Sequence, residues 1–69
     1  MLTADRPATK FTMSVLADCA QREVRLRRQV YPNRVLTGRM SHAFAQVEIA
    51  KMTAIAELLV ELAKRERLL

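Results

Sequence analysis

The sequence predicts an all-α fold, an antiparallel helical hairpin that forms a homo-oligomeric helical bundle. One glycine and two prolines leave too few turn residues for a fold of many strands. Ala, Leu, Arg, Glu, Met and Gln, which favour helices, are abundant. With 51% apolar and 28% charged residues, the 69-residue chain has the composition of a folded domain with room for one small core.

The first helix is expected over about residues 13–30, after an N-terminal extension of residues 1–12. Arginines gather in the last turns of this segment, where the helix macrodipole favours cations. Apolar residues recur at helical spacing and form a stripe for packing. The stripe consists of Met13, Leu16, Ala17, Ala20, Val24 and Val30.

Pro32 is expected to end this first helix near Val30. Proline lacks the backbone N–H that a helix needs, and it disfavours the helical conformation of the preceding residue, Tyr31. Proline is common at the start of a helix and glycine just past its end. Pro32 and Gly38 therefore predict a separate short turn of helix between them.

The second helix is expected from about His42 to Arg67, and it completes a hairpin domain of residues 13–69. Ser41 offers a hydroxyl that can cap its first turn. Between Ile49 and Val60 only three residues are polar, so this helix is apolar nearly all round and needs more than one neighbour. One row of its apolar residues recurs at alternating spacings of four and three residues and forms a seam along the helix. The seam consists of Ala45, Ile49, Met52, Ala56, Leu59 and Ala63.

A single hairpin offers that helix only one neighbour, so we predict an obligate homodimer or larger assembly. With the hairpin tip near Leu36, Val24 and Arg27 are expected to lie beside Glu48. An ion pair from Glu48 to Arg27 or Arg28 is then expected to fix the register of the apolar seam. The predicted oligomer core consists of Phe44, Ile49, Met52, Ile55, Leu59 and Leu62.

The positive charge is concentrated in one segment. The chain has 12 basic and 7 acidic residues, and the segment Arg22–Arg39 contains six arginines and one acid, Glu23. The guanidinium group binds phosphates and carboxylates through two parallel hydrogen bonds. Three interpretations follow: a solvated helix face, an ion-paired oligomer interface, or an anion-binding patch.

Catalytic, metal and membrane-spanning functions find little support in the residues. The single Cys19 has no cysteine or paired histidine to join it in a metal site, and we expect it to be a small core residue. His42 is expected at the surface, and no Ser/His/Asp set or glycine-rich phosphate loop is evident. We therefore expect neither an enzyme nor a cofactor. The chain also lacks an apolar run of the length of a signal peptide or membrane span, which predicts a cytoplasmic protein.

Three segments carry a resemblance to known proteins: residues 22–32 (REVRLRRQVYP), 38–40 (GRM) and 48–55 (EIAKMTAI). They resemble small, mostly uncharacterised helical proteins encoded by tailed phages and prophages. The resemblance covers about residues 21–59. It implies a phage-type origin, in which small non-enzymatic proteins in the host cytoplasm block or sequester a host component.

Three binding hypotheses remain. In the first, the protein sequesters a small phosphorylated ligand such as a nucleotide signal, with arginines and a helix N-terminus on the phosphates and an aromatic ring on the base. This hypothesis assigns ligand binding to Arg25, Arg28, Tyr31, Arg34, Arg39 and Ser41. In the second, the oligomer inhibits a host protein through helix–helix contacts.

The third hypothesis is DNA binding. Residues 10–15 alternate between polar and apolar, which predicts a short strand before two helices, as in ribbon-helix-helix repressors. Pro32 opposes this interpretation because it interrupts what should be one helix. Binding to nucleic acid without sequence preference would need only the arginines, and its affinity would fall steeply with salt.

Overall fold

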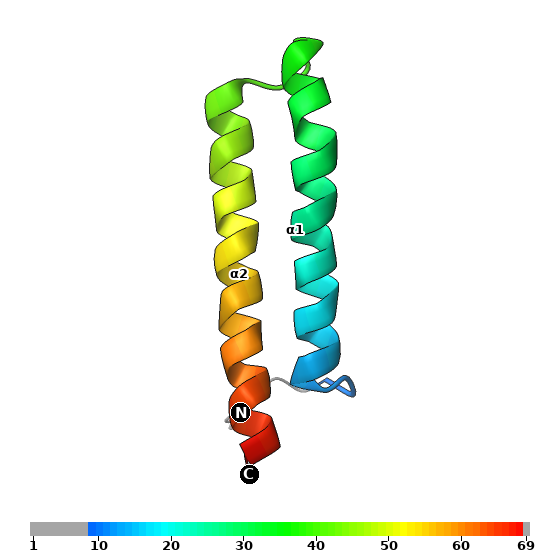
Figure 1. Cartoon of the computed structure of the whole chain (residues 1–69), viewed down its shortest axis with the longest axis vertical. Helices are drawn as coiled ribbons and strands as arrows, with labels where there is room; N and C mark the ends of the chain where they lie inside the picture. The colour runs from blue at the N-terminus through cyan, green and yellow to red at the C-terminus, as the bar shows by residue number, and fades with distance from the viewer. Residues whose placement is uncertain (1–8, 69) are drawn as a thin grey trace, which may run out of the picture.

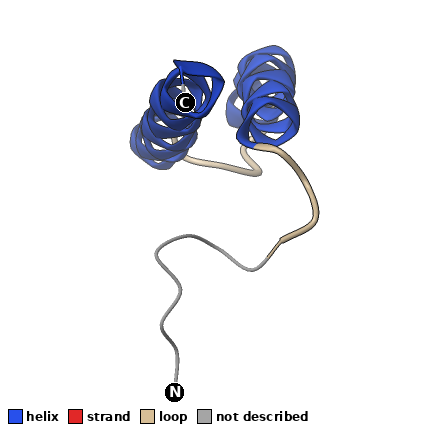
Figure 2. Cartoon of the chain, turned by 90° about the horizontal axis from the view of Figure 1, so that it is seen from below, coloured by secondary structure: helices blue, strands red, loops and turns tan. Residues whose placement is uncertain are grey.

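A computed structural model describes residues 9–68 as two antiparallel helices. Helix α1 spans Met13–Leu36 and helix α2 spans His42–Leu68. The helices lie side by side along the molecule (Figure 1). Seen from the end of the hairpin, no third element of the described chain covers either side of the pair (Figure 2). The predicted all-α hairpin is confirmed, while most of the predicted N-terminal extension, residues 1–8, lies outside the described residues.

Helix α1 begins where the sequence predicts. The side chain of Thr12 accepts a hydrogen bond from the backbone N–H of Val15 at 3.2 Å, which satisfies one of the free donors of the first turn. Because residues 13–15 form this turn, the strand expected over residues 10–15 is wrong. The ribbon-helix-helix interpretation loses the element that would enter the DNA groove.

The expected break at Pro32 is also wrong, because α1 continues through it to Leu36. The missing N–H of Pro32 removes one helical hydrogen bond. The helix nevertheless continues, and backbone bonds from Thr37 to Asn33 and from Arg39 to Arg34 close its last turn. One helix of 24 residues therefore replaces the predicted helix and short turn.

Gly38 terminates α1, as the sequence predicts. The N–H of Gly38 donates to the carbonyl of Val35 at 3.1 Å, and the N–H of Arg39 donates to the carbonyl of Arg34 at 2.9 Å. This pair of bonds is a Schellman motif, which requires a left-handed residue just past the helix end. Gly38 supplies it with φ +76°.

Helix α2 starts after Ser41, whose hydroxyl oxygen accepts the N–H of Phe44 at 3.0 Å. The predicted cap and the predicted length of this helix are both confirmed. In the seam, Ala45, Ala56 and Ala63 are buried against α1, and the larger residues between them are half-buried.

The core between the helices is small. No described side chain is less than 2% exposed. Burial stabilises a protein by about 0.8 kcal/mol per CH₂ group, so alanines contribute little each. The buried core residues are Ala17, Ala20, Val24, Ala45, Ala56 and Ala63.

Two expectations about the core need correction. Cys19 is exposed, because it lies on α1 outside the contact with α2. Val24 packs with Ala56, and not beside Glu48, two turns earlier on α2. The register differs because the loop between Leu36 and His42 centres on Arg39, three residues after the predicted tip at Leu36.

Candidate functional site

The arginines of α1 do not form a single patch. Arg25 and Arg28 line a groove between the two helices. Arg27 points to the opposite side of the helix pair, where it reaches Glu48 of α2. Arg34 lies beside Tyr31. The structure thus divides the six predicted ligand residues among different parts of the surface.

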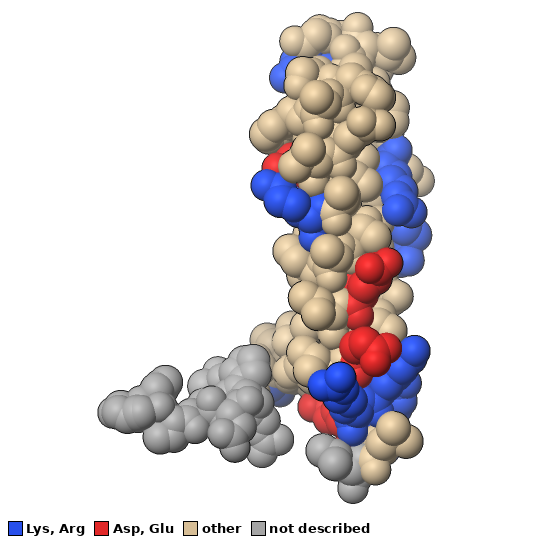
Figure 3. Space-filling view, turned by 90° about the vertical axis from the view of Figure 1, so that its left-hand side faces the viewer, with Lys and Arg blue, Asp and Glu red and all other residues tan. Residues whose placement is uncertain are grey.

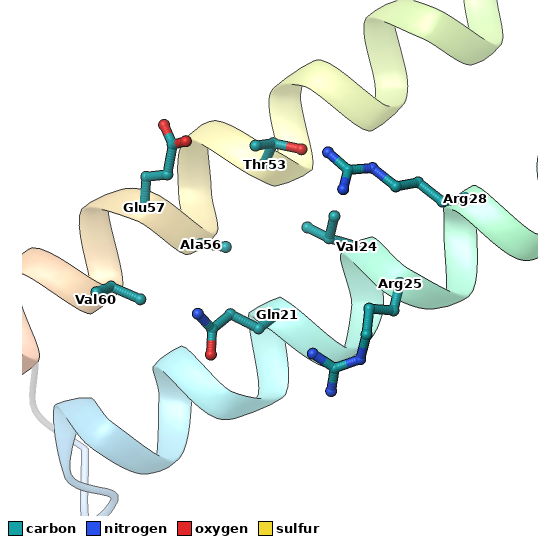
Figure 4. A pocket seen from close by; sticks show the side chains of 8 residues that line it. All are labelled: Gln21, Val24, Arg25, Arg28, Thr53, Ala56, Glu57 and Val60. Atoms are coloured by element: carbon teal, nitrogen blue, oxygen red, sulfur yellow. The ribbon is translucent and has the colours of Figure 1, made fainter.

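The groove that contains Arg25 and Arg28 has a volume of about 330 Å³. Figure 4 shows the side chains of Arg28 and Thr53 pointing toward each other across it, while Glu57 points away from α1. The hydroxyl of Thr53 donates to the carbonyl of Ile49 at 2.8 Å, so it has no proton left for a ligand. The groove is lined by Gln21, Val24, Arg25, Arg28, Thr53, Ala56, Glu57 and Val60.

Tyr31 is predicted to stack on a nucleobase, but two guanidinium groups lie near its ring. The Arg34 guanidinium carbon is 5.7 Å from the ring centroid and that of Arg27 is 6.0 Å away. Both distances are within the range of cation–π attraction. A base would have to displace at least one of these arginines to stack on the ring.

Arg39 and Ser41 lie in the loop between the helices, at the end of the hairpin. Arg39 is exposed, and its backbone N–H is used to end α1. Ser41 uses its hydroxyl oxygen to cap α2. Neither residue lines the groove with Arg25 and Arg28.

Four charged side chains form a connected group on the side of the hairpin opposite the groove. Arg27 Nε donates to Glu23 Oε2 at 3.0 Å, and Arg27 Nη1 lies 4.0 Å from Glu48 Oε1. Lys51 Nζ lies 2.6 Å from Glu48 Oε2. The hydrogen bond to Glu23 is the main cause that raises the pKa of Arg27 above its ordinary value, so this guanidinium stays charged.

This charged group confirms the predicted ion pair between Glu48 and Arg27. The structure selects Arg27 over Arg28, which lines the groove on the other side. Lys51 was not expected to take part, although its position three residues after Glu48 is a spacing that permits a helical ion pair.

The six predicted oligomer-core residues fall into two classes. Ile49, Met52 and Leu59 are half-buried in the hairpin. Phe44, Ile55 and Leu62 are 54%, 48% and 42% exposed and point outward. Figure 3, in which α2 faces the viewer, shows uncharged surface running along most of the molecule between charged groups at both edges. Burial of the exposed residues in an oligomer stays a prediction.

Within residues 9–68, no three His, Cys, Asp or Glu side chains come together in a way that could hold a metal ion. Neither α1 nor α2 contains a stretch both long and apolar enough to cross a membrane. The chain matches no known protein family, no curated protein and no solved structure. The resemblance to phage proteins therefore stays a prediction.

Proposed function

We propose that this chain is a binding protein rather than an enzyme, and that it holds an anionic, nucleotide-like ligand in the groove beside Arg25 and Arg28. The observation that carries this proposal is the position of the two arginines at the groove and their lack of an ion-pair partner. They lie one helical turn apart at the groove, and neither forms an ion pair with any carboxylate among residues 9–68. Two neighbouring arginines without a carboxylate partner can supply the positive charge and the hydrogen-bond donors that a phosphate requires.

The rest of the groove suits the other half of a nucleotide. Val60 is half-buried at the groove and provides apolar surface beside the buried Val24 and Ala56. Gln21 adds an amide that can donate and accept hydrogen bonds. Glu57, at the rim, can accept a hydrogen bond from an exocyclic amino group. The groove volume lies at the small end of the range for ligand sites, which favours a mononucleotide over a larger ligand.

A phage-type origin, which the resemblance of residues 21–59 supports, would place this ligand in the cytoplasm of a host cell. The protein would then act by sequestering the ligand from a host process. This role requires tight binding and no chemical change in the ligand.

Isothermal titration calorimetry with a panel of linear and cyclic nucleotides tests the proposal. We expect one nucleotide class to bind, and Arg28→Ala and Arg25→Ala each to weaken binding by about tenfold or more, because each removes a charge-assisted hydrogen bond. Arg22→Ala is the matched control, since this exposed arginine lies on another side of α1, beside Val15 and Cys19. No binding to any nucleotide, or equal losses in all three variants, would refute the proposal.

A second candidate function is inhibition of a host protein through helix–helix contacts. It is favoured by the exposed large apolar side chains, among them Leu36 at 84% and Leu58 at 66% exposure. A pull-down from host lysate should then recover one protein in stoichiometric amount, and nuclease treatment should not release it. Loss of the captured protein after nuclease treatment would instead indicate nucleic-acid binding.

A further inference from the structure

Each helix carries a second apolar stripe, which lies outside the contact between the two helices. On α2 these side chains are 42% to 66% exposed and recur at spacings of three and four residues around Lys51. On α1, Val15 and Leu26 are each 51% exposed, and Cys19 and Glu23 lie between them at the same spacings. The α2 stripe consists of Phe44, Val47, Ile55, Leu58 and Leu62.

The two stripes lie on the same side of the hairpin. Residues three or four apart share one side of a helix. Glu23 therefore belongs to the α1 stripe, and Glu48, four residues after Phe44, borders the α2 stripe. Arg27 bonds to both of these glutamates, so the two stripes flank this charged group. Together they form one surface, which we call the apolar face.

We infer that a second copy of this chain covers the apolar face, so that two hairpins pack as a four-helix bundle. The buried core of one hairpin consists of five alanines and one valine, while large apolar residues such as Phe44 and Leu58 are exposed. Four-helix bundles bury such outer stripes between helix pairs. The spacings of three and four residues are those of helices that pack at a shallow angle.

Charge favours a second copy as the occupant. The chain carries a net charge of +5, so two copies repel through most of their surfaces. The apolar face differs, because its central charges balance: Glu23 and Glu48 oppose Arg27 and Lys51. A two-fold interface brings a surface against itself, and a charge-balanced apolar surface tolerates this contact.

The opposite side of the hairpin stays free in this arrangement. The groove with Arg25 and Arg28 lies away from the apolar face, so the inference does not depend on the proposed ligand. An acidic partner protein would be expected at those arginines and not at the apolar face. Failure of nucleotide binding and failure of self-association are therefore separate results.

Light scattering coupled to size-exclusion chromatography tests the interface with the full chain and four variants. We expect Leu58→Glu and Leu26→Glu to raise the concentration at which the assembly dissociates by at least about tenfold, because each places a charge in an apolar interface. Gln46→Glu and Gln21→Glu are the controls, since they add the same charge to exposed positions of the same helices on the groove side. Equal effects in all four variants would overturn the inference.

Cys19 gives a second test that needs no variant. It is the chain's one cysteine and lies exposed in the α1 stripe of a single hairpin. We expect the rate of its alkylation by a maleimide to fall as the protein concentration rises, because the second copy covers it. A folded wild-type chain whose alkylation rate is the same at all concentrations, or which stays monomeric at high micromolar concentration, would contradict the proposed interface.

Discussion

Arg27 joins the two helices near the middle of the hairpin by bonding to Glu48. Its Nη1 atom donates to the backbone carbonyl of Glu48 at 3.0 Å and lies 4.0 Å from the Glu48 carboxylate. The Arg27 side chain is 23% exposed, so solvent screens these contacts only in part. Among residues 9–68, this link is the one hydrogen-bonded connection between the central parts of the two helices, whose contact otherwise consists of apolar residues.

We predict that Arg27→Met destabilises the protein by about 1–2 kcal/mol, because it removes a charged donor while methionine keeps much of the apolar stem. Urea unfolding followed by circular dichroism measures the loss, at one fixed protein concentration because assembly shifts apparent stability. Arg25→Met is the control. Arg25 has no ion pair with the described carboxylates, so Arg25→Met should change the free energy of unfolding by no more than about 0.5 kcal/mol.

The pH dependence of the link should distinguish arginine from lysine at this position. The pKa of Arg27 is raised in the folded state. The stabilisation that its charge gives is therefore fully present below the ordinary pKa of arginine, and it is lost only as the pH rises above that pKa. In Arg27→Lys the corresponding loss should begin near pH 10.4, the approximate pKa of a free lysine. The difference in unfolding free energy between this variant and wild type should therefore widen above pH 10. A constant difference from pH 7 to 11 would show that the charge at position 27 is not what stabilises the contact.

Pro32→Ala should stabilise the hairpin. Pro32 lies inside α1 and is exposed, so alanine restores a backbone N–H without disturbing a buried contact. Proline in a helix interior costs about 3 kcal/mol relative to alanine, and because only one turn follows it we expect a gain of about 1–2 kcal/mol. Thermal unfolding measures the change. A loss of stability would mean that the proline ring itself packs at the hairpin tip.

Ser41 should act as a helix cap and not as a ligand residue. Its hydroxyl oxygen accepts the Phe44 N–H, so Ser41→Ala should reduce stability by about 1 kcal/mol, and Ser41→Asn should restore it. Nucleotide affinity, corrected for the folded fraction, should be unchanged in both variants. A selective loss of affinity in Ser41→Ala would return this residue to the binding site.

The contacts between the helices were largely predictable from the sequence. The 3.6-residue period places Ala45, Ala56 and Ala63 on one side of α2, and the structure buries all three. The antiparallel arrangement of a short-looped hairpin also brings Arg27 close to Glu48. These features follow from geometry that the backbone imposes on any helical hairpin.

The features that sequence reasoning missed depend on competition between local and tertiary effects. The local penalty of Pro32 is real, but α1 continues past it to the turn at Gly38, whose backbone bonds run back to Val35 and Arg34. The six predicted ligand residues are close in sequence, yet a helix turns them to different sides and separates Arg28 from Arg27. Cys19 is apolar enough for a core, but its position on α1 points it outward.

Native mass spectrometry of the full chain at low micromolar concentration tests the proposed assembly most directly. A hairpin whose buried core consists of five alanines and one valine should appear as a dimer or a larger assembly. The assembly should unfold as it dissociates, and its thermal midpoint should rise with protein concentration. A single hairpin that remains folded as a monomer, with a thermal midpoint independent of concentration, would show that this small core is sufficient and that no second copy covers the apolar face.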